Sequence, residues 1–198
     1  MSLYMNQKVS DGSSGWAIEV IRSRRRTLAL ELKEDGRVLL RVPRWCSGLE
    51  IRRFVEQNRD WIERKLRENE ERREALAAIP KLTEEELRAL QKRGRAVFPA
   101  RCAVYAPLLG VSYGRISVRR QHSKWGSCSG KGNLNFNCLL LLAPESVLDY
   151  VVVHELCHRR EMNHSKRFWA LVESICPDFR EARRWLRENG GALLARLP

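Results

Sequence analysis

The chain has 198 residues, 43% of them hydrophobic, which is typical of a folded protein and argues against wholesale disorder. No run approaches the roughly 18 consecutive apolar residues of a membrane-spanning helix, so neither a transmembrane segment nor a membrane partner is predicted. Lysine and arginine outnumber aspartate and glutamate by 37 to 24, and the resulting net charge of +13 leaves open a polyanionic partner such as nucleic acid.

Residues 1–15 are polar and lack the apolar core of a signal peptide, so we expect a flexible tail there. The cysteines form no CxxC pair and show no regular spacing, which favours reduced thiols, several of them in the core. These features predict a cytoplasmic protein, whereas the sequence does not predict an oligomeric state. The cysteines are Cys46, Cys102, Cys128, Cys138, Cys157 and Cys176.

The next region, residues 16–80, is predicted to begin as a β-meander. Trp16 to Ile21 forms a first strand, and apolar residues then alternate from Leu28 to Leu32 and from Val38 to Val42. Between these two runs, Glu34-Asp35-Gly36 is a hairpin turn signal.

From Ser47 the apolar period becomes helical, with Ile51, Val55 and Ile62 near one stripe. A charged stretch continues this helix with little to bury, and Ile79-Pro80 marks an internal boundary. The chain is therefore expected to divide into 16–80 and a core at 81–198, with 16–198 forming one structural unit.

The second region opens with Thr83 and Glu86, which are spaced as a helix capping box. Pro99 and Gly110 are expected to punctuate the sequence that follows. Beyond them, Ile116 to Val118 and Asn133 to Leu139 alternate as strands, with the small-residue loop 123–130 between them.

A helix that begins near Pro144 is apolar nearly all round as far as Leu156, and is therefore predicted to be buried. It carries His154-Glu155-Leu156-Cys157-His158, an HExxH motif. Two histidines four residues apart project from one helix face and can bind one zinc ion, while Glu155 can take a proton from bound water. Burying these polar groups without a metal would be costly, which favours a metal site over two core histidines.

The third ligand must come from beyond this helix, and His164 is the first choice. Asn163 tolerates left-handed turn conformations, so the chain can reverse there, and Ser165 can cap a new helix. Glu161 and Glu173 are the alternatives, because a glutamate on a downstream helix is the third ligand in thermolysin-like enzymes.

The spacing from His154 to His164 is that of metzincins, but Glu161 stands where they have glycine and no methionine turn can be assigned. Taken together, several motifs resemble the YgjP-like metallopeptidases, also called predicted metal-dependent hydrolases, whose core is similar to that of SprT-type proteases. The resemblance covers roughly residues 16 to 185. Its motifs are Trp125-Gly126-Ser127-Cys128, Leu134-Asn135, the run from Asp149 to Leu156, Asn163-His164-Ser165 and Phe168-Trp169.

This resemblance implies an α+β fold in which a zincin-like core, a small antiparallel sheet packed on the HExxH helix, follows the N-terminal meander and long helices. It also implies one Zn²⁺ per chain, held by His154, His158 and His164, and a peptide or protein substrate. The mechanism expected of such a site is hydrolysis by a zinc-activated water, with Glu155 as general base.

Five further residues are candidates for substrate binding. Trp125, Ser127 and Asn135 lie on segments that could form the lip of a cleft where a peptide adds as a strand, although Trp125 is equally well explained as a core aromatic. His122 and Tyr150 are candidate hydrogen-bond donors to the oxyanion.

Two other classes of function compete with the peptidase. A nucleic-acid-associated protein would use the charge excess, and it could coincide with a protease that acts on DNA-bound proteins. A metal-bound structural module would have no need of Glu155, so the intact HExxH motif favours the enzyme.

Overall fold

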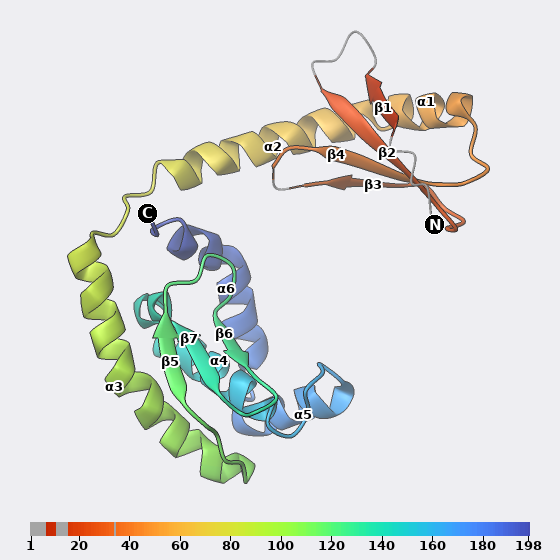
Figure 1. The fold of residues 1–198 in the computed structure, drawn as a ribbon. Helices are drawn as coiled ribbons and strands as arrows, with labels where there is room; N and C mark the ends of the chain where they lie inside the picture. The colour runs from red at the N-terminus through yellow and green to blue at the C-terminus, as the bar shows by residue number, and fades with distance from the viewer. Residues whose placement is uncertain (1–6, 11–15, 34) are drawn as a thin grey trace. The chain divides into compact units, whose positions relative to one another are not determined.

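The computed structural model describes residues 7–10, 16–33 and 35–198 (Figure 1). The chain forms two compact units, Met1–Ala77 and Ala78–Pro198, and the predicted boundary at Ile79-Pro80 lies beside this division. Each unit combines helices with a small sheet, so the fold is mixed α+β, as predicted. Within the described residues no helix combines the length and the apolar character needed to cross a membrane, and the cytoplasmic location stays a prediction.

The sheet of the first unit is not the predicted meander. Its strands are β1 (Gln7–Ser10), β2 (Ala17–Ser23), β3 (Ala29–Leu32) and β4 (Val38–Pro43), in the order β1-β2-β4-β3. β3 and β4 form the expected antiparallel hairpin, but β2 pairs with β4 in parallel. The reason is burial: β4 is apolar on both faces and takes the central place, whereas β3 is only partly buried and lies at the edge.

The predicted tail also contains a strand. Residues 1–6 and 11–15 lie outside the described residues, but Gln7–Ser10 forms β1 and pairs antiparallel with β2. Four residues with a single valine give no periodic signal, so this strand follows from the unpaired edge of β2 rather than from its own sequence.

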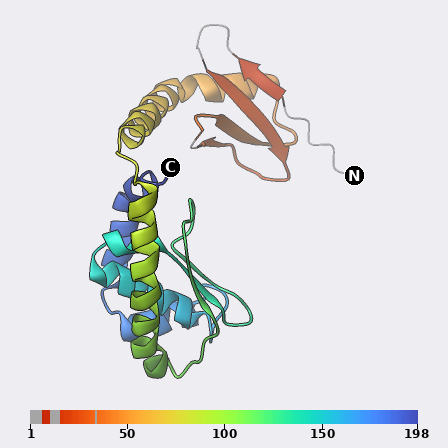
Figure 2. The ribbon, with the colours of Figure 1, turned by 60° about the vertical axis from the view of Figure 1, so that its left-hand side comes forward.

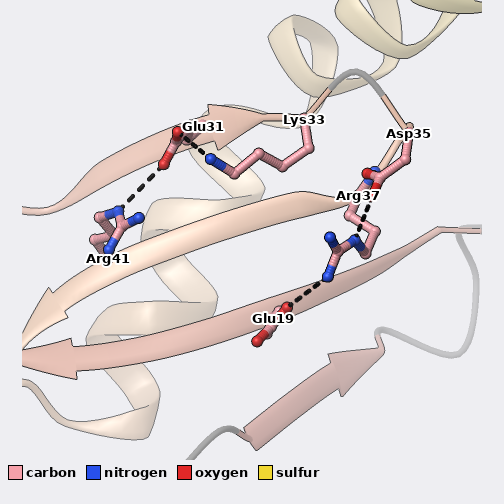
Figure 3. A network of polar contacts seen from close by, with 6 residues as sticks. All are labelled: Glu19, Glu31, Lys33, Asp35, Arg37 and Arg41. Atoms are coloured by element: carbon pink, nitrogen blue, oxygen red, sulfur yellow. Dashed lines mark hydrogen bonds and ion pairs between the residues drawn. The ribbon is translucent and has the colours of Figure 1, made fainter. Parts of the chain in front are cut away.

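Charged side chains link neighbouring strands on the surface of this sheet (Figure 3). Glu31 on β3 accepts from Lys33 Nζ at 2.5 Å and from Arg41 Nε on β4 at 3.2 Å. Arg37 contacts Asp35 at 2.8 Å and reaches Glu19 on β2 at 3.7 Å. The positive charges of the hairpin are therefore largely paired within it.

The predicted long helix is two helices, α1 (Gly48–Gln57) and α2 (Arg59–Ala77), which meet at Asn58. A capping box of Ser47 and Glu50 starts α1. The Asn58 side chain donates to the carbonyl of Phe54 at 2.7 Å, and such competition with the backbone explains the break that the apolar period did not reveal. Ile51, Val55 and Ile62 pack on the sheet in a core that belongs to this unit alone.

The second unit begins with α3 (Glu84–Leu109), and its capping box of Thr83 and Glu86 is confirmed. Pro99 does not interrupt this helix, contrary to the prediction. Pro99 removes only one hydrogen bond, and the fully buried Phe98 and Cys102 hold the helix in the core around it. Gly110 ends the helix in the left-handed conformation, with φ at 62°.

The second sheet has the order β5-β7-β6, formed by β5 (Ile116–Arg119), β6 (Gly126–Cys128) and β7 (Leu134–Asn137). It is mixed rather than antiparallel as predicted, because β5 and β7 are parallel and only β6 runs antiparallel to β7. β6 also lies within the predicted loop 123–130, where small residues hid the strand pattern. The 3-10 helix η1 (Cys138–Leu142) replaces the predicted end of β7, since Asn137 accepts from the Leu139 N–H and starts a turn.

Three helices complete this unit: α4 (Glu145–Cys157), α5 (Lys166–Ile175) and α6 (Phe179–Leu194). α4 is buried, as predicted, and contacts α3, α5, α6 and β6. Figure 2 shows these helices gathered on one side of the second sheet. The polar residues of α4 are therefore placed by the core of the unit, between the sheet edge β6 and the helices α5 and α6.

Candidate metal centre

The last turn of α4 brings two imidazoles together. His154 lies within the helix and His158 caps its C-terminus, and their ring centroids are 5.0 Å apart. The apolar residues around them, such as Val152, Val153 and Leu156, are fully buried. The core thus fixes the helix from which both histidines project.

A short turn then returns His164 to this pair. Arg159 Nε donates to the Ser112 carbonyl at 2.9 Å, which anchors the start of the turn, and Ser165 caps α5 by accepting from the Phe168 N–H, as predicted. The reversal needs no left-handed Asn163, because among the described residues only glycines have positive φ. His164 Nε2 lies 3.0 Å from His154 Nε2.

The three histidines form a compact donor set. One nitrogen atom from each of His154, His158 and His164 can be chosen so that all three lie within 4.8 Å of one another. The fully buried Phe168 lies beneath them, with its ring centroid 4.6 to 4.8 Å from each imidazole. The start of α5 thus positions His164, and Phe168 on the same helix gives all three imidazole rings an apolar contact.

The Nδ1 atoms of the two α4 histidines are engaged elsewhere. His158 Nδ1 lies 3.1 Å from the Glu161 carbonyl, which can only accept, so this nitrogen carries the hydrogen. His154 Nδ1 lies 3.4 Å from the Tyr150 hydroxyl. His158 therefore presents an unprotonated Nε2, and His154 does the same when its Nδ1 donates to the Tyr150 oxygen.

The electrostatics of the site suit a metal ion. Burial lowers the pKa of His154 to about 3 and also lowers the pKa of His158, so both imidazoles are neutral at physiological pH. Neutral imidazoles with free Nε2 atoms are transition-metal ligands. The residues present therefore fit a bound metal ion.

Glu155 lies beside this donor set at the bottom of a cleft. Its side chain is buried, and this burial raises its pKa to about 8 although Lys124 opposes the shift. A Cβ added at Gly126 on β6 would come within 2.7 Å of the Glu155 Cγ and Oε1, so only glycine leaves room for the carboxylate. The cleft has a volume of about 220 Å³ and is lined by Lys124, Trp125, Gly126, Tyr150, Val151, His154, Glu155 and Leu186.

The sequence matches the model of a known protein family over most of its length. The model for the YgjP-like metallopeptidase domain matches residues 26–88 and 80–189. The chain belongs to the YgjP-like metallopeptidase family. The donor set of this YgjP-like enzyme lies inside the second matched segment.

Among solved structures, the chain is similar to the crystal structure of the metallopeptidase zymogen of Pyrococcus abyssi abylysin, with 22% sequence identity and a TM-score of 0.43. The similarity covers 46% of this chain and 94% of that chain. No curated protein matched the sequence.

The five candidate substrate residues of the YgjP-like enzyme lie in different places. Trp125 and Tyr150 line the cleft, and Trp125 also packs closely against Gly190 of α6. Ser127 lies on the edge strand β6, opposite Asn135 on the central strand β7. His122 is exposed and is not among the residues that line the cleft.

The two alternative ligands do not join the donor set. Glu161 contributes its backbone carbonyl, which holds His158 Nδ1. The Glu173 carboxylate is exposed and accepts from Arg180 at 2.6 Å instead of contacting an imidazole.

Sequence reasoning missed several residues that shape this site. Phe168 was predicted only as part of the Phe168-Trp169 motif, and its position against three imidazole rings follows from the turn before α5. Gly126 was one small residue in a loop, and its role depends on the approach of β6 to α4. Lys124 and Leu186 reach the cleft from segments that are distant in sequence.

Proposed function

We propose that this metallopeptidase is a zinc enzyme with a zincin-like core, in which His154, His158 and His164 hold the metal and Glu155 is the general base. The observation that carries the proposal is the convergence of three imidazoles, one nitrogen of each lying within 4.8 Å of the others. A ligand set made only of imidazole favours zinc over magnesium or calcium, which prefer oxygen. Bound zinc would supply Lewis acidity and would lower the pKa of a bound water molecule.

Glu155 is suited to move a proton because the protein fixes its carboxylate. The side chain is buried between α4 and Gly126, and it lines the same cleft as His154. The carboxylate would take the proton of the attacking water and would later deliver it to the leaving amine. Burial raises the pKa of Glu155, and the charge of a bound metal ion would lower it again, which would keep the carboxylate ionised and able to accept the proton.

The substrate would bind along β6, the edge strand beside the cleft. One side of β6 pairs with β7, and among the described strands the other side has no neighbour. A peptide can add there by backbone hydrogen bonds, with Trp125 and Tyr150 around its side chains. Asn135 and His122 remain proposed contacts, but Asn135 lies on a strand that is paired on both edges, so β6 rather than β7 is the better lip.

The test combines metal analysis with substitution of the base. Protein purified after zinc-replete expression should carry close to one zinc per chain, and both His154→Ala and His158→Ala should abolish zinc binding. Glu155→Gln should retain the zinc and the fold but lose roughly 100- to 10,000-fold in hydrolysis of an unfolded protein, because an amide cannot accept the proton. Protein without metal would contradict the site, and full activity in Glu155→Gln would contradict the base.

A further inference from the structure

We propose that Lys124, Arg183, Arg184 and Arg187 form a basic rim that selects peptide substrates with acidic residues beside the bond to be cut. The proposal rests on the proposed peptidase function and specifies its class of substrate. Lys124 lines the cleft, and the three arginines lie on α6, which also supplies Leu186 to the cleft.

The arginines of α6 share one face of the helix. Arg180, Arg183, Arg184 and Arg187 are spaced by three or four residues, which places their side chains next to one another. A surface hollow of about 360 Å³ is lined by these four residues alone. The hollow is therefore lined by arginine side chains, whose guanidinium groups suit carboxylates geometrically as well as electrostatically.

This face borders the candidate metal centre. Leu186, about one helical turn after Arg183, lines the cleft itself. The Arg183 guanidinium lies over the Trp169 ring, 4.5 Å from its centroid, and the Trp169 centroid lies 5.7 Å from that of His164. Lys124 lines the cleft next to Trp125. A peptide in the cleft would thus pass between cations on two sides.

The rim cations are not neutralised by the protein. Among the described residues, no carboxylate forms an ion pair with Lys124, Arg183, Arg184 or Arg187, whereas Arg180 pairs with Glu173. By contrast, the α2 cations Arg64, Lys65 and Arg73 pair with glutamates three or four residues away. The rim cations therefore keep their charge available for a ligand, whereas the paired cations of α2 do not.

The chemistry of the neighbouring site favours an acidic peptide as the occupant. A strand added to β6 extends by roughly 3.3 Å per residue, so side chains two or three residues from the cut bond can reach the rim. Nucleic acid could use the same charges, but it would have no need of the apolar and backbone groups of the cleft. The two occupants can therefore be separated by matched probes.

The experiment measures binding of three fluorescent peptides to full-length Glu155→Gln protein by anisotropy. The peptides share an Ala-Ala-Phe-Ala core and carry three flanking glutamates, glutamines or lysines on each side. The glutamate peptide should bind roughly three- to thirtyfold more tightly than the glutamine peptide, as expected for two or three exposed ion pairs. The preference should fade between 0.1 M and 1 M salt, as the screening length falls from roughly 10 to 3 Å.

Two variants locate this preference. Arg184→Gln with Arg187→Gln leaves the Arg183–Trp169 contact in place and should remove most of the preference. Lys92→Gln with Arg95→Gln is the matched control, because both residues are exposed on α3 and have the same spacing and charge. Arg183→Glu with Arg187→Glu should reverse the order, so that the lysine peptide binds best.

Three results would contradict the proposal that the rim selects acidic peptides. The first is equal binding of the glutamate and glutamine peptides. The second is a loss of the glutamate preference in the α3 control as large as that in Arg184→Gln/Arg187→Gln. The third is tighter binding of a short oligothymidylate of the same charge, if Arg184→Gln/Arg187→Gln loses this binding but binds the peptides unchanged. Mass spectrometry of the recovered peptide keeps the two proposals apart. A cut peptide would count against Glu155 as the base, and the rim would then be judged from the relative cleavage rates of the three peptides.

Discussion

Hydrogen bonds to the Nδ1 atoms of His154 and His158 orient these rings as metal ligands. His158 is held by a backbone carbonyl, which no side-chain substitution at Glu161 removes, whereas His154 depends on the Tyr150 hydroxyl. Burial raises the pKa of Tyr150 to about 12, so this hydroxyl keeps its proton at physiological pH. The two ligands on α4 are therefore oriented by partners of different kinds.

Tyr150→Phe tests whether the hydroxyl orients His154 or serves the substrate. The ring and its packing remain, so the fold should be unchanged, while zinc affinity should fall by up to roughly tenfold because an oriented imidazole loses its partner. Competition with a zinc chelator measures the affinity. Unchanged zinc affinity with a reduced kcat would instead support the role of Tyr150 at the oxyanion.

His164 should prove to be the third ligand. His164→Ala should weaken zinc binding by more than the roughly 10- to 100-fold that follows loss of a ligand's hydrogen-bond partner. Glu161→Ala and Glu173→Ala should leave it nearly unchanged, since neither carboxylate lies in the donor set. Zinc titration of the three variants measures this. If Glu173→Ala bound no zinc while His164→Ala still bound zinc tightly, Glu173 rather than His164 would be the third ligand.

At the scale of elements, β6 and α4 approach so closely that one glycine separates them. Gly126→Ala should lower the rate of peptide hydrolysis by roughly tenfold or more, because the added methyl group displaces the Glu155 carboxylate. Zinc content should remain close to that of the parent protein, because no ligand is touched. Gly130→Ala is the matched control, since a Cβ there meets no atom within 4 Å. A fully active Gly126→Ala protein would show that the carboxylate is free to move.

The elements also show what sequence patterns can and cannot predict. The histidines of α4 followed from a spacing of four on one helix. The helix after Ser47 followed from its apolar period, and the helices after Thr83 and Ser165 followed from their capping residues. These signals are local. The strand order β1-β2-β4-β3 and the short strand β6 depend instead on which edge each strand finds in three dimensions. Distant segments meet at the cleft for the same reason, so its lining could not be predicted in full.

The whole molecule contains two separate main cores. Ile18, Leu40 and Ile62 belong to the first unit, and the residues around α4 form the main core of the second. The candidate metal centre lies entirely in the second unit, together with every residue of the proposed rim. Stability of the first unit and metal binding by the second should therefore respond to different substitutions.

Ile62→Ala tests this separation. Removing a side chain that is only 1% exposed should destabilise the first unit by about 2–5 kcal/mol, through lost burial and the cavity left behind. Zinc content and affinity should stay unchanged. Calorimetry with and without the substitution should show one transition moved to lower temperature. A parallel loss of zinc would show that the two cores unfold together.

The contact between Gly126 and Glu155 has a consequence for how the sequence can vary. The backbone of β6 at position 126 and the side chain at position 155 occupy adjoining space. Neither residue can therefore be replaced by a larger one while the other stays the same. A methyl group at 126 would be accommodated without movement only by a side chain at 155 that lacks Cγ, such as alanine, and alanine cannot accept a proton. Substitutions at the two positions should therefore be epistatic, and a second-site change at 155 could relieve the clash without restoring the chemistry.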